Sequence, residues 1–104
     1  MNWYKISKKI NMKFPKDECG DLKSRLKRNK NIFTTRVDRE QNKYRVGDIV
    51  KVDFWDNELE VVSVKTYSDI RKHPFYRELT DDWKNQIKDK KFDVIELEEL
   101  DELV

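Results

Sequence analysis

The residues with the clearest potential for chemistry lie between positions 29 and 48 of the sequence. Lys30 and Asn31 follow a polar turn, and Thr34, Thr35 and Arg36 come just after them in a segment rich in β-branched and aromatic residues. Side chains alternate along a strand, so Thr34 and Arg36 are expected to share one face, with Thr35 on the other. An arginine at such a position can bind a phosphate or a carboxylate through paired hydrogen bonds.

Two interpretations of this cluster stay open from the residues alone. A threonine acts as a nucleophile when a base lies within hydrogen-bond reach, and a lysine with a lowered pKa is one such base. The simpler interpretation is that Thr34 and Arg36 occupy ordinary strand positions and that Arg36 forms an internal salt bridge. Composition alone favours the simpler interpretation.

Other catalytic and metal-binding motifs are absent from the sequence, which has no Walker loop, no dinucleotide-binding fingerprint and no paired cysteines. Its one cysteine, Cys19, and its one histidine, His73, are far apart, so a zinc site would need carboxylates to complete it. We therefore expect no cofactor and no metal. Cys19 is expected to be a small buried side chain, and His73, which precedes Pro74, an exposed or capping one.

Length and composition indicate one domain over residues 1–104, with an extra N-terminal segment of about residues 1–10 and an acidic tail of about residues 98–104. A single cysteine excludes an intramolecular disulfide and fits a reducing, cytoplasmic setting. No apolar run approaches the ~20 residues that span a bilayer. The lysines scattered through the first 14 residues are unlike a signal peptide. We expect a cytoplasmic protein with no membrane partner.

Charge is divided unevenly along the chain. Residues 1–45 contain 14 Lys and Arg against 5 Asp and Glu (+9), whereas residues 46–104 contain 9 against 16 (−7), which together give the net charge of +2. Such separation predicts a face that meets an anion, such as a phosphate or a nucleic acid. The alternative is that the two halves interleave in the fold and the charges only decorate a solvated surface.

The first half of the chain predicts two extended segments and a helix. The extended segments are Trp3–Ile6 and Ile10–Phe14, the second ended by Pro15. The helix that follows has Asp17 as its expected N-cap. Its apolar stripe is Cys19, Leu22 and Leu26. Asn29 suits the C-terminal position with positive φ.

The second half predicts strands with one more helix. The elements, in order, are a strand at Ile32–Val37, a polar loop at Asp38–Lys43, a hairpin of Ile49–Trp55 and Leu59–Tyr67, a loop or helical turn at Ser68–Tyr76, a helix at Asp81–Lys88 capped by Thr80, and a strand at Phe92–Leu97. This order predicts an α+β fold, a small curled β-barrel of five or six strands with two short helices. Ligands of such folds bind in a cleft where a helix meets a strand edge.

The run from Leu26 to Arg36, followed by Tyr44-Arg45-Val46-Gly47-Asp48 and a hairpin, resembles the ASCH family of the PUA-like superfamily. Members typically read aliphatic-x-x-Gly-x-Lys-Thr-x-Thr-x-Arg, a short loop, then aromatic-x-x-Gly-Asp. The resemblance covers roughly Met12 to Leu97. It implies a small β-barrel whose cleft suits RNA, a nucleotide or a modified nucleoside.

One bacterial branch of that family is an amidohydrolase that removes acyl groups from N4-acetylcytidine, with the motif Lys as base, the second Thr as nucleophile and a Glu before the late helix. Thr34 matches the nucleophile and Arg36 the motif Arg, whereas Asn31 stands where the motif has its Lys. Lys30, one residue away, is a displaced candidate base, and Glu78 is the nearest candidate for the Glu.

The leading hypothesis is an ASCH-type module that binds RNA or a nucleotide-like ligand in a basic cleft. Cations would meet phosphate, and Tyr44 would stack on a base. The predicted ligand-binding residues are Lys30, Asn31, Thr34, Arg36, Tyr44 and Arg45. One alternative is an amidohydrolase that uses Thr34, Lys30 and Glu78. Another is a protein-interaction adaptor that presents the acidic segment Glu96–Glu102 to a basic partner.

Overall fold

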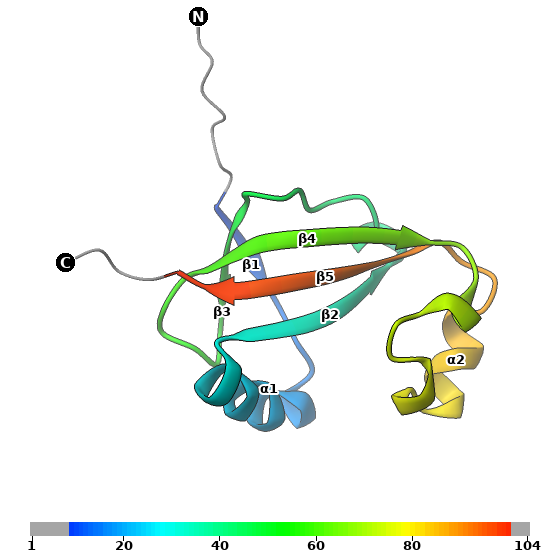
Figure 1. Cartoon of the computed structure of the whole chain (residues 1–104), viewed down its shortest axis with the longest axis horizontal. Helices are drawn as coiled ribbons and strands as arrows, with labels where there is room; N and C mark the ends of the chain where they lie inside the picture. The colour runs from blue at the N-terminus through cyan, green and yellow to red at the C-terminus, as the bar shows by residue number, and fades with distance from the viewer. Residues whose placement is uncertain (1–8, 101–104) are drawn as a thin grey trace, which may run out of the picture.

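A computed structural model of the chain describes residues 9–100 and shows a five-stranded sheet with two α-helices (Figure 1). The strand order is β1-β3-β4-β5-β2. Strand β1 runs parallel to β3, and the other neighbours are antiparallel. The strands are β1 (Lys9–Met12), β2 (Asn31–Val37), β3 (Ile49–Val52), β4 (Leu59–Tyr67) and β5 (Phe92–Glu99).

The predicted α+β class and the curled sheet are confirmed, and the sheet is not closed, so β1 and β2 are edge strands in the described part of the chain. The predicted hairpin is the antiparallel pair of β3 and β4, whose first strand ends at Val52 rather than Trp55. The strand predicted at Trp3–Ile6 lies outside the described residues.

Helix α1 (Lys16–Asn29) is joined directly to β2 through its C-cap residue. It begins directly after Pro15, so the prediction of Asp17 as N-cap is wrong, and Asp17 lies in the first turn, where acids are favourable. At the other end Lys30, rather than Asn29, has the left-handed conformation (φ 62°), and its N–H donates to the Leu26 carbonyl at 2.9 Å. The turn falls one residue later than predicted because β2 starts at Asn31, immediately after Lys30.

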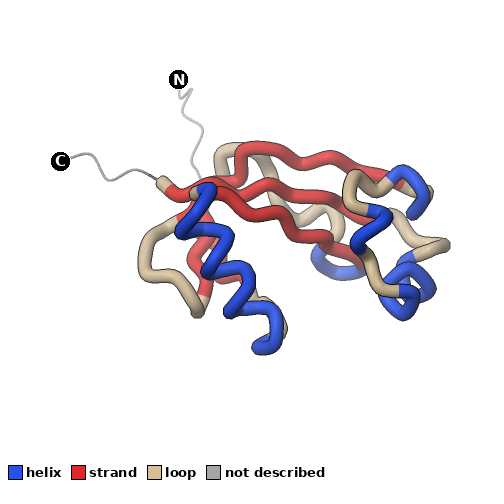
Figure 2. The backbone as a smooth tube through the Cα atoms, turned by 60° about the horizontal axis from the view of Figure 1, so that its bottom comes forward, coloured by secondary structure: helices blue, strands red, loops and turns tan. Residues whose placement is uncertain are grey.

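Helix α2 (Asp81–Ile87) has the predicted N-cap, since Thr80 Oγ1 accepts a hydrogen bond from the Trp83 N–H at 3.2 Å. Two short 3-10 turns, Ile70–Lys72 and Tyr76–Glu78, occupy the loop that precedes it. Figure 2 shows these turns and α2 at one end of β2, with α1 at the other end. Among the described residues, none of the helices is long and apolar enough to cross a membrane.

Two hydrophobic cores hold β2 from opposite sides. Ile32 points into the main core, which packs Leu26 of α1 against β1, β3, β4 and β5. Val37 packs against a second core, built around Phe92 of β5 and Ile87 of α2. Each large apolar side chain that is fully buried contributes about 1.5–3 kcal/mol. The edge strand is therefore fixed in position although its outer side is unpaired among the described residues.

The loop after β2 is anchored by a buried carboxylate. Asp93 of β5 is 0% exposed and accepts hydrogen bonds from the Asn42 N–H at 2.7 Å, the Thr66 hydroxyl at 2.6 Å and the Gln41 amide at 3.2 Å. Three hydrogen bonds from the loop and from β4 thus converge on this one side chain. These bonds place Glu40 close to the end of β2, where it enters the site described next.

Candidate functional site

A cleft of about 720 Å³ is lined by β2, by the N-terminal half of α1 and by the segment that contains the 3-10 turns and α2. Figure 2 shows the backbone of these elements, with α1 and α2 at opposite ends of β2. Five consecutive strand residues, 33–37, line the cleft. A central strand shows only alternate residues to one cavity, because its side chains point to opposite faces of the sheet. At an edge strand, one cavity can contact side chains on both faces of the sheet. The cleft therefore extends over the edge of the sheet and borders both of its faces.

The backbone of β2 also faces this cleft. The Glu99 N–H donates to the Lys30 carbonyl at 2.8 Å, which makes these two residues a hydrogen-bonded antiparallel pair. Hydrogen-bonded pairs alternate along an antiparallel ladder, so the N–H and C=O groups of Ile32 and Thr34 point toward β5, opposite Leu97 and Ile95. The N–H and C=O groups of Phe33 and Thr35 point outward and have no backbone partner among the described residues. Within residues 9–100, two backbone donor and acceptor pairs are therefore unpaired on the strand edge that borders the cleft.

Arg36 is held inside the protein rather than presented to solvent. Its side chain is 12% exposed, its Nη2 donates to the Lys13 carbonyl at 3.1 Å, and its Nη1 lies 3.5 Å from Glu40 Oε1. Its guanidinium carbon lies 4.6 Å from the centre of the Phe14 ring. Burial lowers the pKa of Arg36, although nearby Glu40 acts to raise it, and the group stays a cation at neutral pH. The simpler expectation, an internal salt bridge, is what the structure contains.

Thr34 shares a face with Arg36, as predicted, and Arg36 Nε donates to its hydroxyl oxygen at 3.1 Å. A hydroxyl that accepts one hydrogen bond keeps its own proton to donate. Among the described residues no acceptor receives that proton, and Thr34 lines the cleft. The arginine therefore holds the Thr34 hydroxyl oxygen and leaves its proton available to an acceptor in the cleft.

Thr35 and His73 form a second hydroxyl site across the edge of β2. Thr35 Oγ1 and His73 Nε2 are 2.7 Å apart, and His73 Nδ1 accepts the Phe75 N–H at 3.0 Å. Burial lowers the pKa of His73, so the ring is neutral at pH 7. A neutral imidazole with an acceptor Nδ1 carries its proton on Nε2. Nε2 therefore donates to Thr35 and has no lone pair with which to act as a base, while the Thr35 hydroxyl keeps its proton.

His73 was expected to be exposed or to cap a turn. The structure corrects the first part, since the residue is 4% exposed and its ring stacks on Phe92 with centroids 5.4 Å apart. The second part holds, because Nδ1 caps the Phe75 N–H in the turn after Pro74. Cys19 is only partly buried, lies away from this cleft and donates to the Pro15 carbonyl at 3.4 Å.

The charge of the lining differs from the expected basic cleft. Six carboxylates outnumber three cationic side chains, and Asp21 and Glu40 already pair with Arg25 and Arg36. The charges are those of Asp17, Glu18, Asp21, Glu40, Glu78 and Asp82 against Lys13, Arg25 and Arg36. The lining is therefore net negative, by three charges. The prediction failed because the basic residues of α1 belong mostly to its other side.

Aromatic rings make up much of the remaining lining. Phe33 is 40% exposed and meets Phe75 edge-on, with ring centroids 5.0 Å apart. Trp83 of α2 and Phe14 also line the cleft. The sequence placed Thr35 in the polar cluster without a binding role, and it did not indicate His73, Phe75 or Trp83 as site residues. Strand alternation places Phe33 and Thr35 on one face, which could have indicated that they act together. Nothing local in the sequence links His73 or Trp83 to β2.

The structure brings together three of the predicted site residues. Thr34, Arg36 and Glu78 line the cleft. Four others lie outside it: Lys30 forms the C-cap of α1, Asn31 donates to Glu96 at 2.7 Å, Tyr44 donates to Glu40 at 2.6 Å, and Arg45 donates to the carbonyls of Asn42 and Tyr44. The ring of Tyr44 is 1% exposed and has no open face on which a base could stack, which corrects that expectation.

Known proteins are similar to this chain in fold, and none of the similarities indicates an activity. The sequence matches no known protein family and no curated protein. The structure is similar to a crystal structure of hypothetical protein PH0355, with a TM-score of 0.56 and 17% identity over 88% of this chain and 99% of that one. A solution NMR structure of protein PF0455 from Pyrococcus furiosus gives a TM-score of 0.47 and 13% identity over 93% and 100%. The first likeness shows that the chain has a known small-protein fold.

Acidification is expected to weaken the fold through His73. Its folded pKa lies below the ordinary value, so the unfolded chain takes up a proton more readily, and stability present above pH ~6.5 falls as the pH drops toward the folded pKa. His73 is the one histidine of the chain, so NMR titration of its ring is unambiguous. We expect a pKa below ~6.5 and a proton on Nε2 at pH 7.5. A pKa at or above that value contradicts the assignment.

Tyr44→Phe is expected to lower the free energy of unfolding by about 1.5–3 kcal/mol, because its buried hydroxyl donates to the Glu40 carboxylate. The measurement is chemical denaturation at pH 7. The matched control is Tyr67→Phe, whose hydroxyl has no partner among the described residues and whose loss is expected to change stability by less than about 0.5 kcal/mol. Equal effects of the two substitutions contradict the assigned role of Tyr44.

Proposed function

We propose that the protein is an ASCH-type binding module of the PUA-like superfamily and that the cleft along β2 receives the base of a nucleoside. The observation that carries the proposal is the lining of one cleft by five consecutive residues of an edge strand, 33–37. These residues bring free backbone groups, oriented hydroxyls and an aromatic ring to one place. The order of Thr34, Arg36 and the later Gly47-Asp48 is the ASCH-like pattern of the sequence.

The chemistry of the cleft matches a planar heterocycle. A nucleobase carries hydrogen-bond donors and acceptors along one edge and a flat apolar face. The cleft offers the backbone N–H and C=O of Phe33 and Thr35 and two hydroxyl donors for the edge. Phe33, Phe75 and Trp83 offer aromatic surface for the face. Donors, acceptors and rings are all present within one cavity of about 720 Å³.

The charge of the lining narrows the class of ligand. Three excess carboxylates repel a phosphate brought into the cleft, and the one arginine beside Thr34 already donates to Thr34 and Lys13. A free nucleoside, or a base whose phosphate stays outside the cleft, meets no such repulsion. The ligand of the cleft itself is therefore proposed to be the uncharged nucleoside part rather than the phosphate.

Hydrolysis of an acylated nucleoside is less well supported. Thr34 and Glu78 line the same cleft, as that alternative requires, but Lys30 does not line it. Thr34 Oγ1 accepts from Arg36 and has no base beside it among the described residues. The imidazole of His73 has its acceptor nitrogen turned to Phe75. Binding of a nucleoside requires no such proton acceptor, so we prefer the binding function to hydrolysis.

The adaptor alternative concerns the acidic end of the chain. Glu96 accepts from Asn31, and Glu99 accepts from Trp55 and Asn57 at 2.7 and 2.6 Å. Both carboxylates thus have partners within the protein, and residues 101–104 lie outside the described part of the chain. No contact in the described residues favours this alternative over binding in the cleft.

Thr34→Val is expected to weaken cytidine binding roughly five- to tenfold, because one hydroxyl donor is lost while the shape of the side chain is kept. Binding is followed by NMR titration, with the indole N–H of Trp83 as reporter of the cleft. Thr34→Ser restores the hydroxyl and is expected to restore affinity.

Ser24→Ala serves as the matched control, since it deletes a hydroxyl on α1 that contacts the Gly20 carbonyl and lies outside the cleft. Its affinity for cytidine is expected to equal that of the unaltered protein. Binding of cytidine that is unaffected by Thr34→Val, or absent altogether from a folded protein, contradicts the proposed function.

Incubation with N4-acetylcytidine separates binding from hydrolysis. We expect the unaltered protein and Thr34→Ala to release cytidine at the same background rate, because no base is positioned to activate Thr34. The products are measured by chromatography at pH 7 to 8. Turnover by the unaltered protein that disappears in Thr34→Ala refutes this expectation and favours the amidohydrolase.

A further inference from the structure

Helix α1 separates the surface into two sides of opposite charge. At 3.6 residues per turn, Lys16, Lys23 and Lys27 follow one line along the helix, at spacings of seven and four, and Lys30 is the C-cap that follows the last turn. We call these four residues the lysine flank. The acids Glu18 and Asp21 lie on the other side, where they line the cleft described above.

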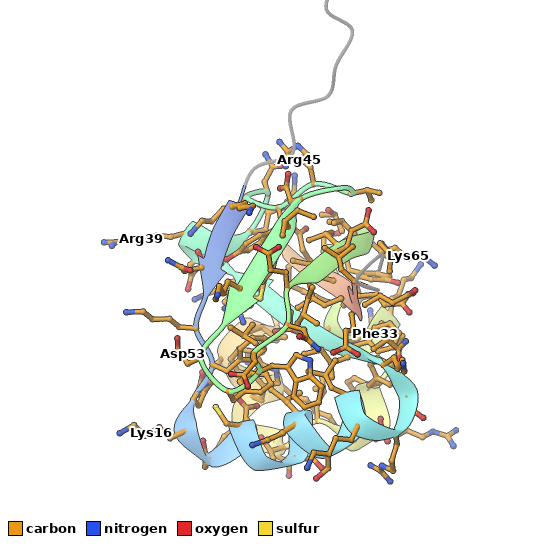
Figure 3. The ribbon with its side chains drawn as sticks, turned by 90° about the vertical axis from the view of Figure 1, so that its left-hand side faces the viewer. Lys16, Phe33, Arg39, Arg45, Asp53 and Lys65 are labelled. Carbon is orange, nitrogen blue, oxygen red and sulfur yellow. The ribbon has the colours of Figure 1, made fainter. Side chains whose placement is uncertain are left out.

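A second cavity, of about 610 Å³, lies beside the lysine flank. Lys23 and Lys27 form its helical wall, and the connection between β3 and β4, residues 53–57, forms the other. Trp55 is half-buried in that wall, with its indole N–H bonded to Glu99 at 2.7 Å. In Figure 3, Lys16 and Asp53 lie toward the side of β1 and β3, whereas Phe33 of the cleft lies toward the opposite side. The two cavities are therefore distinct.

Lys30 lies close to Glu99, whose N–H donates to the Lys30 carbonyl at 2.8 Å. Hydrogen bonds from Asn57 and Trp55 lower the pKa of Glu99, and the charge of Lys30 adds to that effect. Asn57 and Trp55 both line the second cavity. Lys30 thus lies near Glu99, which accepts hydrogen bonds from two residues of the groove, and it does not line the cleft, although the sequence had suggested it for the nucleoside site.

The balance of charge here is opposite to that of the cleft. The four lysines of the flank form no salt bridge with any other described residue. Asp53 and Asp56 line the groove and Glu99 lies beside Lys30, which leaves the flank and groove together with one positive charge in excess. A row of unpaired lysines about 21 Å long, estimated from the helical rise, complements a chain of phosphates better than a single anion.

We propose that the lysine flank binds the sugar–phosphate backbone of a single-stranded nucleic acid and that Trp55 stacks on one of its bases. An unpaired base is required because the bases of a duplex are already stacked on each other. The proposal rests on the proposed function only in taking a nucleoside-containing molecule as the partner. It assigns phosphate recognition to the outer side of α1 and leaves base recognition to the acidic cleft.

The test is a binding titration with an oligouridylate of about ten nucleotides at several salt concentrations, with oligothymidylate of equal length and polyglutamate in parallel arms. Four phosphate contacts predict a slope of roughly −3 in a plot of log K against log salt. Binding of RNA alone, or of RNA and DNA alike, supports the proposal and identifies the source of the phosphates. Equal binding of polyglutamate overturns it, because that polymer has no base to stack.

The key variant is Lys23→Gln combined with Lys27→Gln, which is expected to reduce the slope by about 1.4. The matched control is Lys65→Gln combined with Lys91→Gln, two exposed lysines that line neither cavity and whose replacement is expected to leave the slope unchanged. An equal loss in both double variants, or no loss in either, overturns the assignment to the flank.

Indole N–H resonances separate this proposal from the proposed function. Oligouridylate is expected to shift the Trp55 signal, and cytidine the Trp83 signal, with both signals assigned by Trp→Phe substitution. If cytidine shifts the Trp83 resonance but oligouridylate does not shift the Trp55 resonance, the flank proposal is contradicted and the proposed function is not. The reverse result contradicts the nucleoside cleft and leaves the flank proposal supported.

Discussion

The antiparallel pairing of β2 with β5 is the interaction on which the candidate site depends. It directs the backbone of Ile32 and Thr34 inward to β5 and leaves that of Phe33 and Thr35 without a backbone partner in the described part of the chain, at the edge of the sheet. An unprotected edge commonly invites association with other chains. Here α1 flanks the edge on one side, and the 3-10 turns with α2 flank it on the other, so the free groups lie in a cleft instead of on an open surface.

Charge is organised around the same helix. The sum over the first 45 residues is strongly positive, yet the cleft that those residues help to build is acidic, because α1 turns its lysines and its acids to different sides. Arg36, the cation closest to Thr34, is occupied by the Lys13 carbonyl and Glu40 and orients a hydroxyl. The arrangement fits a ligand whose uncharged part enters the cleft and whose phosphates, if it has any, remain outside.

The sequence predicted the elements well, because helix and strand periodicity are local. The same periodicity predicted that Thr34 and Arg36 share a face, which their hydrogen bond at 3.1 Å bears out. The far wall of the cleft was out of reach, since His73 stands 38 residues after Thr35 and meets it only through the tertiary fold. The basic character of the cleft was mispredicted for a related reason. Net charge along a chain does not say which side of a helix each residue occupies.

Amide hydrogen exchange along β2 tests the central claim most directly, because it reads the free edge itself. In the protein alone, the Phe33 and Thr35 amides should exchange quickly and the Ile32 and Thr34 amides slowly, as the β2–β5 register requires. Saturating cytidine should slow exchange at Phe33 and Thr35 and leave Lys51 of β3 unchanged. Exchange at Phe33 and Thr35 that stays fast when the nucleoside is bound contradicts recognition at the edge of this strand.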